Sequence, residues 1–275
     1  MHTSIENPEM TEPVERDPGA VAAVLWFLRL AMRTYFRSEV HGMEKVPDGG
    51  ALLVGNHSGG LLAMDVPIIA VAFSDAFGVD RPLYCLAHDL LFTGSGDSLF
   101  RRYGFIPAQR ENALRVLRDG AATIVFPGGD YDVFRPTRQG SVIDFNGRTG
   151  YVRTALEAGV PIVPVVSLGG QEAQLHLSRG RLLGRLSPFR KLMRTDLFPL
   201  SVGFPFGLTA AFPPNLPLPT KIVTEVLDPI DPATVLGRRI KHPDRYVDRI
   251  DQLVRDRMQD ALSELARRRR FPVLG

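Results

Sequence analysis

Apolar and polar positions alternate along this chain in blocks that predict strands and helices in turn. Between residues 51 and 167, short apolar runs of strand length alternate with amphipathic stretches of helical length. The expected strands are 51–54, 83–87, 122–126 and 160–167, and the expected helices are 66–77, 111–119 and 150–158. This alternation predicts an α/β fold with a mostly parallel central sheet flanked by helices.

An amphipathic helix is expected at each end of this pattern. Residues 20–36 read as a helix in which Trp26 and Phe27 supply apolar surface. Arg29 and Arg33, with Arg37 directly after the helix, recur every four positions. Its longest uncharged run is too short to span a bilayer, which takes roughly 20 residues. We therefore expect an interfacial helix over 20–38, with a helix packed on the core as the alternative. Residues 246–266, after a strand at 221–226, predict a C-terminal amphipathic helix.

The pattern changes after residue 173. No acidic residue occurs between 173 and 195, where six basic residues stand, and no charged residue occurs between 197 and 219. Four phenylalanines and six prolines lie in that uncharged stretch, and prolines at this density exclude a long helix. We expect residues 173–219 to form a basic and apolar lobe that faces lipid; a core segment beside a solvated basic loop is the alternative.

Composition adds limits on domains and compartment. With 275 residues and 44% hydrophobic content, the chain suits a single domain over 20–275. Residues 1–19 are acidic and contain proline, so we expect a disordered tail, and we expect no secretory signal. Cys85 is the only cysteine, which favours a reducing compartment and excludes an internal disulfide. The net charge of +3 says little about partners.

The pair His57 and Asp65 carries the strongest chemical signal. An apolar run ends at Gly55, His57 follows at once, and Gly59 and Gly60 separate it from Asp65. Such a segment presents an imidazole at the carboxyl end of a strand with a carboxylate in reach. A histidine oriented in this way can remove a proton from an alcohol near neutral pH. The alternative is a histidine that only satisfies its loop.

Three further segments gain meaning beside this pair. Arg110 ends the run 104–110 at a loop–helix junction, where it could hold a phosphate. The strand 122–126 leads into Pro127-Gly128-Gly129-Asp130, whose glycines allow close approach to a ligand, and Arg135 follows. The third segment is the proline-containing strand 160–165.

In this order, the four segments resemble the glycerolipid acyltransferase superfamily, which includes the lysophosphatidic acid acyltransferases. The resemblance covers about residues 38–170 and has two departures. Seven residues, rather than the usual four, separate His57 from Asp65, and Gly128 stands where the family has a glutamate associated with acceptor binding. The Pro-Gly-Gly form looks more like the branch of monoacylglycerol and diacylglycerol acyltransferases. Asp130 and Asp132 are candidates to replace the missing carboxylate.

The resemblance implies a peripheral membrane O-acyltransferase of lipid metabolism on the cytoplasmic face. His57 would be the general base and Asp65 its orienting carboxylate. The expected substrate-binding residues are Asn56, Ser58, Gly59, Gly60, Arg110, Gly128, Gly129, Asp130 and Arg135. The expected partners are acyl-CoA or acyl carrier protein as donor, a glycerolipid or lysophospholipid acceptor, and an anionic membrane surface. No cofactor, metal or nucleic acid is expected, and the sequence does not define an oligomer.

Other classes of protein fit the sequence less well. A serine hydrolase motif around Ser58 would need glycine at position 56, which is Asn56, and a dinucleotide motif would need glycine at Leu99. Metal binding by the histidines lacks a tight ligand spacing. A catalytically silent lipid-binding member of the fold and a thioesterase remain open, and the dependence of thiol release on an acceptor separates these alternatives.

Overall fold

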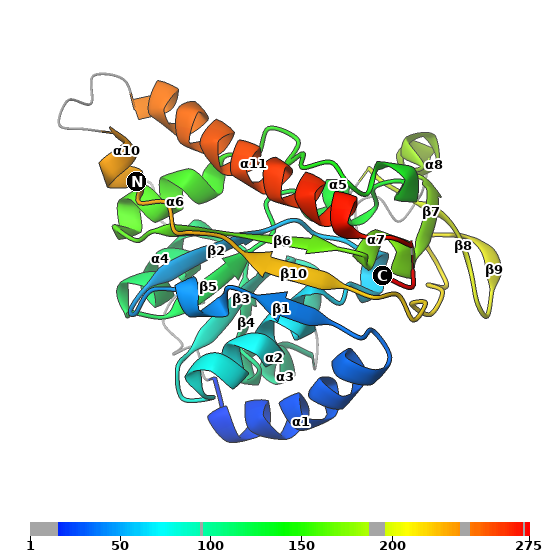
Figure 1. Ribbon diagram of the computed structural model, residues 1–275, viewed down its shortest axis with the longest axis horizontal. Coiled ribbons are helices and arrows are strands. Elements are labelled where there is room, and N and C mark those ends of the chain that lie inside the picture. The colour runs from blue at the N-terminus through cyan, green and yellow to red at the C-terminus, as the bar shows by residue number, and fades with distance from the viewer. Residues whose placement is uncertain (1–15, 94–95, 187–195, 237–242, 272) are drawn as a thin grey trace, which may run out of the picture.

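A seven-stranded sheet forms the centre of the molecule (Figure 1). The structure, a computed structural model, describes residues 16–93, 96–186, 196–236, 243–271 and 273–275. In spatial order the strands are β1 (Glu39–His41), β10 (Val223–Val226), β6 (Ile162–Leu168), β2 (Ala51–Gly55), β5 (Ala122–Val125), β3 (Leu83–Ala87) and β4 (Phe105–Pro107). Strands β2 to β6 run parallel, and β10 lies antiparallel to β6. The predicted fold class is confirmed.

Strand β2 occupies the middle of the sheet and is buried at all five positions. Its Leu53 is in register with Ile124 of β5 and Val163 of β6. A strand covered on both faces is apolar throughout rather than alternating, which is the pattern of its sequence. The carboxyl ends of the parallel strands therefore meet at one edge of a rigid sheet.

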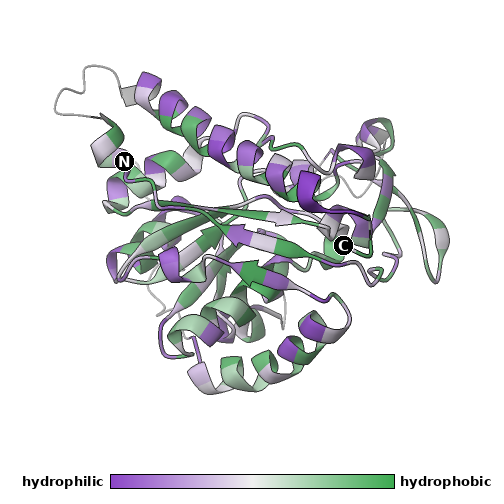
Figure 2. Ribbon diagram, in the orientation of Figure 1, coloured by the Kyte–Doolittle hydropathy of each residue, from purple (hydrophilic) through white to green (hydrophobic). Residues whose placement is uncertain are grey.

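Helices cover both faces of the sheet (Figure 1). On one face lie α4 (Arg110–Arg118), α6 (Gly150–Ala158) and α11 (Pro243–Arg268). Helix α11 packs along β6 with Ile250, Val254 and Met258 fully buried, and Figure 2 shows hydrophilic and hydrophobic residues alternating along it. On the other face, α2 (Asp65–Phe77) buries Ile69 and Phe73 against the sheet. Helix α1 (Pro18–Thr34) packs on the outer side of α2.

A second, smaller sheet extends from one end of the molecule (Figure 1). It is antiparallel and consists of β7 (Leu175–Ser178), β8 (Leu200–Gly203) and β9 (Gly207–Ala210). The other α-helices within the described residues are short: α3 (Gly96–Arg102), α5 (Gly129–Val133), α7 (Gly170–Ala173), α8 (Arg181–Leu186) and α10 (Pro232–Leu236). The sequence pattern did not predict this sheet.

The N-terminal helix differs from its prediction in two respects. It begins at Pro18 rather than at residue 20, with Asp17 as its N-cap, so the last residues of the expected tail are helical; residues 1–15 lie outside the described part. Arg29 and Arg33 donate hydrogen bonds to Asp75 of α2, so both are ion-paired, although 65% of the Arg33 side chain remains exposed. The exposed surface of α1 also carries Trp26, Phe27 and Leu30.

Helix α2 is apolar enough to resemble a membrane span but serves as a core helix. The stretch Gly60–Phe77 meets the length and hydropathy expected of a span. Only residues 65–77 form the α-helix, about 20 Å long, whereas a hydrocarbon layer is about 30 Å thick. Because α2 lies between the sheet and α1, its apolar residues are explained by packing.

Candidate active site

The site begins where β2 ends, at Asn56 and His57. The Asn56 side chain is buried and exchanges two hydrogen bonds with the backbone of Ser167 in β6, at 2.9 and 2.8 Å. This clamp fixes the ends of two neighbouring parallel strands. Asn56 was expected among the substrate-binding residues, and the structure gives its side chain this structural partner instead.

His57 and Asp65 lie together at this edge. The Nδ1 atom of His57 is 3.1 Å from Oδ2 of Asp65, which is fully buried as the first residue of α2. Ser58 donates to the same carboxylate from its backbone N–H, at 2.7 Å, and from its hydroxyl, at 3.0 Å. The Asp65 carboxylate therefore has fixed partners. Because it bonds Nδ1 of His57, Nε2 is the ring nitrogen that points away from Asp65.

The spacer between the two residues folds back through a glycine turn. Gly59 and Gly60 have φ values of +89° and +70°, in the left-handed region that side chains with a Cβ rarely adopt. A single 3-10 turn, Gly60–Leu62, then leads to the start of α2. The seven intervening residues thus bring Asp65 back to the imidazole, despite the longer spacing.

The His57 ring rests on Phe126, which follows β5. The two rings are stacked, with centroids 4.3 Å apart and planes 22° from parallel. Gly55 makes this possible, since a Cβ there would come within 2.7 Å of the Phe126 ring. With one face covered and 22% of its side chain exposed, the imidazole is held in place yet remains accessible.

Asp132 supplies a second buried carboxylate that the site-residue prediction did not include. Its Oδ2 accepts the backbone N–H of His57 at 2.7 Å, and its Oδ1 accepts two hydrogen bonds from Arg135, at 3.0 and 2.7 Å. Gln171 donates to the backbone carbonyl of Asp132 at 3.1 Å. Burial raises the pKa of Asp132, and the neighbouring Arg135 opposes that shift.

The Asp132 side chain occupies the space that a side chain at position 128 would need. A Cβ at position 128 would overlap the Asp132 side chain. The chain therefore has room for the Asp132 carboxylate only because residue 128 has no side chain. The sequence suggested Asp132 as one replacement for a carboxylate at position 128. In the structure, Asp132 accepts a hydrogen bond from the backbone of His57 and forms an ion pair with Arg135.

Arg135 does not occupy an open position. Its side chain is 2% exposed, and its guanidinium is bonded to Asp132 and to the carbonyl of Asp144. The expectation that it contacts substrate is therefore corrected: it is the buried partner of Asp132. A basic residue after a glycine turn suggests a phosphate ligand in sequence, but the i, i+3 spacing from Asp132 was the signal of an internal ion pair.

Asp130 and Arg110 lie at the surface in ion pairs. Asp130 accepts a hydrogen bond from Arg148 at 2.7 Å, beside Gly129. Arg110 begins α4 and pairs with Glu157 of α6, with half of its side chain exposed. Because β4 stands three strands from β2, its end lies roughly 14 Å from the His57 end of the sheet, and Arg110 follows β4 in the chain. It is not part of the immediate surroundings of the imidazole.

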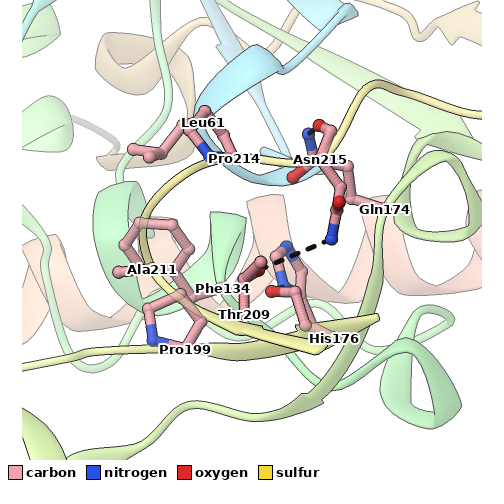
Figure 3. Close-up of a pocket in the computed structure, with 10 residues that line it drawn as sticks. Leu61, Phe134, Gln174, His176, Pro199, Thr209, Ala211, Pro214 and Asn215 are labelled. Atoms are coloured by element: carbon pink, nitrogen blue, oxygen red, sulfur yellow. Dashed lines mark hydrogen bonds between the residues drawn. The ribbon is translucent and has the colours of Figure 1, made fainter. Parts of the chain in front are cut away.

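A small cavity adjoins the glycine turn (Figure 3). Apolar side chains line one part of it and neutral polar side chains the other: Leu61, Phe134, Pro199, Ala211 and Pro214, and Gln174, His176, Ser201, Thr209 and Asn215. The His176 Nδ1 lies 2.8 Å from the Ser201 hydroxyl, and its Nε2 has no hydrogen-bond partner among the described residues. Burial lowers the pKa of His176 to about 4, so this ring is neutral at pH 7.

The described residues contain no group of three or more His, Cys, Asp and Glu side chains placed to hold a metal ion. The imidazole of His88 accepts a hydrogen bond from the backbone N–H of Leu90. The chemistry that the edge of the sheet supports is that of an accessible imidazole with a buried carboxylate partner.

Known proteins share this arrangement of segments. The acyltransferase family model matches residues 37–168. The uncharacterized protein Rv0502 of Mycobacterium tuberculosis is 34% identical over 263 residues, which cover 94% of this chain and 70% of that protein. The mouse DGAT1/2-independent enzyme synthesizing storage lipids is 28% identical over 192 residues, or 69% of this chain and 55% of the enzyme.

A solved structure agrees with the sequence matches. The crystal structure of the 1-acyl-sn-glycerophosphate (LPA) acyltransferase PlsC from Thermotoga maritima superimposes with a TM-score of 0.54 at 21% identity, covering 90% of this chain and 79% of PlsC. That likeness shows the fold. The family match identifies an acyltransferase. The chain belongs to the glycerolipid acyltransferase superfamily.

Proposed function

We propose that this protein is a peripheral membrane enzyme that moves a fatty acyl group from a thioester donor to a hydroxyl group of a glycerolipid. The observation that carries the proposal is the accessible His57 imidazole, whose Nδ1 is held by buried Asp65. The donor would be acyl-CoA or acyl carrier protein. The work would take place on the cytoplasmic face of the membrane.

In this mechanism, Nε2 of His57 takes the proton of the acceptor hydroxyl while the hydroxyl oxygen attacks the thioester carbonyl. Asp65 keeps the proton of the neutral ring on Nδ1 and stabilises the imidazolium that forms. General-base catalysis of this kind contributes roughly 10²–10⁴-fold in rate. When the tetrahedral intermediate collapses, the thiolate leaves and the proton on Nε2 passes to it.

Backbone amides near the imidazole would stabilise the oxyanion. The N–H groups of Ser58 and Gly129 are already bonded, to Asp65 and to the carbonyl of Phe126. We therefore assign the oxyanion to the amides of Gly59, Gly60 and Gly128, of which the first two belong to the turn beside His57.

The arginines support an uncharged acceptor and a long donor. Arg135, which follows the glycine turn at 128–129, is buried and paired with Asp132, so it is not placed to bind a phosphate of the acceptor. Its burial favours a hydroxyl lipid without phosphate, such as an acylglycerol, over a lysophospholipid. Arg148 and Arg110 are each about half exposed and each paired with a carboxylate, and either suits a phosphate of a long donor such as coenzyme A.

Acyl transfer is tested by mixing the purified protein with acyl-CoA and a panel of acceptors that includes monoacylglycerol, diacylglycerol and lysophosphatidate. Free thiol is followed with a chromogenic reagent, and lipid products by mass spectrometry. Background from the protein is expected to be low, because burial raises the pKa of the Cys85 thiol to about 12. We expect thiol release that depends on the acceptor.

His57→Ala should lower the rate by about 100-fold or more, because the general base is lost. The matched control is His41→Ala, which removes an exposed histidine on β1 and should leave the rate unchanged. Full activity in His57→Ala would refute the mechanism. Thiol release without any acceptor would identify a thioesterase, and no release from the wild type with any acceptor would identify a silent lipid-binding member of the fold.

A further inference from the structure

The small sheet β7–β8–β9 has its polar side chains inside and its apolar side chains outside. His176, Ser201 and Thr209 are buried, one on each strand. Leu175, Val202 and Leu208 are exposed and form one row, because the strand register pairs Leu175 with Val202 and Val202 with Leu208. An antiparallel sheet with one face in water shows the opposite arrangement.

The turns at the end of this sheet extend its apolar surface. Phe204 and Phe206, between β8 and β9, are 70% and 54% exposed, and Leu208 is 67% exposed. The outward hydrophobic character continues past β9 to Phe212 and Leu216. Figure 2 shows the β8–β9 hairpin as predominantly hydrophobic, and no charged residue occurs between 197 and 220. A contiguous surface of this kind marks an interaction site.

Hydrogen bonds fix the polar face inward and so hold the apolar face outward. Asn215 accepts the backbone N–H of Phe206 at 3.0 Å and donates to the carbonyl of Gly207 at 2.9 Å. Gln174 in turn donates to the carbonyl of Asn215 at 2.8 Å. On the inner side, His176 bonds Ser201 and lines the cavity in Figure 3. Turning the sheet over would break these bonds, so the exposed phenylalanines are a property of the folded structure.

The neighbouring helix α8 is basic and also apolar. Arg181 and Arg185 lie on it beside Leu182 and Leu183, which are both exposed. The sequence from 173 to 195 contains no acidic residue. Positive charge next to an uncharged apolar surface complements anionic lipid headgroups above hydrocarbon. A second copy of the chain on this face would bring like charges together, which favours the lipid surface as the partner.

We infer that the β8–β9 hairpin inserts into an anionic phospholipid bilayer, with the row Leu175–Val202–Leu208 and the Phe204–Phe206 turn in the hydrocarbon and α8 at the headgroups. This inference deepens the proposed function, from which it takes only the premise that the substrate is a lipid. The hairpin is an attachment separate from α1. Its inner face lines the cavity beside the His57 turn, so it would bring that turn close to the lipid.

The first test measures binding to vesicles without any acyl donor. A variant with Phe204→Ser, Phe206→Ser and Leu208→Ser is compared with a control carrying Leu99→Ser and Val142→Ser, two exposed apolar residues outside the hairpin. On mixed phosphatidylcholine and phosphatidylglycerol vesicles, the hairpin variant should bind about tenfold or more weakly, and the control should match the wild type. Circular dichroism checks that both variants are folded. Weaker binding of the wild type to phosphatidylcholine alone is expected.

The second test places a probe in the turn. The chain has one tryptophan, Trp26 in α1, so Trp26→Phe together with Phe206→Trp gives a protein with a single tryptophan in the hairpin. Brominated acyl chains should quench its fluorescence, because the side chain would lie in the hydrocarbon. The reference protein carries Trp26→Phe and Phe271→Trp, with its tryptophan at an exposed position near the C-terminus, and it should be quenched less.

Two results would overturn the inference. One is vesicle binding that is equal in the hairpin variant and the wild type, and the other is unquenched fluorescence from the Phe206→Trp protein on bound vesicles. A wild-type dimer in size-exclusion chromatography that the hairpin variant converts to a monomer would assign the face to self-association instead. Insertion by a protein that transfers no acyl group would leave this inference intact and remove the proposed function, so the two failures are distinguishable.

Discussion

At the scale of single residues, the site has a carboxylate at position 132 and no side chain at position 128. The glycine removes a side chain where the superfamily pattern has a glutamate, and the space it leaves is taken by Asp132. The relocated carboxylate holds the backbone of His57 and pairs with Arg135. Its position favours a role in fixing the imidazole over a role in contacting the acceptor.

Gly128→Ala should reduce both stability and activity. The φ of Gly128 is −63°, which any residue adopts, so the effect would come from overlap with Asp132 and not from backbone strain. We expect a loss of about 1–3 kcal/mol in the free energy of unfolding, measured by chemical denaturation. The control is Gly150→Ala, because a Cβ at Gly150 meets nothing within 4 Å. Equal stability of the two variants would contradict this account.

At the scale of elements, α1 joins the core on one side and presents an apolar surface on the other. Val21, Leu25 and Met32 are buried, whereas Trp26, Phe27 and Leu30 are exposed. Deleting the helix would uncover α2, so substitutions on the exposed side are the better test of a membrane role. The prediction of an interfacial helix stays a prediction until lipid binding is measured.

Replacing Trp26, Phe27 and Leu30 by serine should weaken sedimentation with anionic vesicles by about tenfold, because apolar surface would be lost from the interface. The same surface control, Leu99→Ser with Val142→Ser, should sediment as the wild type does. The helix content of the variant should be unchanged, since none of the three side chains is buried. Unchanged sedimentation would show that α1 is only a structural helix.

Strands β2, β3, β5, β6 and β10 of the main sheet could be predicted because their patterns have the length and apolar character of buried strands. The edge strands β1 and β4 were not predicted, because each has only three residues. The sequence also predicted that His57 and Asp65 are within reach, because both belong to one short segment. The second sheet was not predicted: its polar residues point inward, which reverses the pattern that a water-facing sheet would show. Arg135 was misassigned because charge alone does not reveal burial; its pairing with Asp132 depends on the turn formed by α5.

At the scale of the whole molecule, buried His176 links stability to pH. Burial lowers its pKa from the ordinary 6.5 to about 4 in the folded protein, so the unfolded chain binds the proton more tightly between these values. Stability is therefore lost as the pH falls below about 6.5. From pH 7 to pH 5 this group alone should cost about 2 kcal/mol in the free energy of unfolding.

Chemical denaturation at several pH values measures this contribution. His176→Gln keeps a polar side chain in the cavity but does not titrate, so its stability should fall less between pH 7 and pH 5 than that of the wild type. His41→Ala, which removes an exposed histidine, should keep the wild-type pH dependence. Parallel curves for the wild type and His176→Gln would show that the imidazole does not carry the effect.

The stacking of α1 on α2 affects how mutational data on this protein should be interpreted. The carboxylate that orients His57 is the first residue of α2, and Val71 and Ile68 of the same helix lie against the buried side of α1. A substitution that weakens the packing of Leu25 or Met32 against α2 would shift Asp65, and so the orientation of His57. Lost turnover in such a variant would report misalignment of Asp65, whereas turnover lost only on vesicles, after a change at Trp26 or Phe27, would report poor access to substrate.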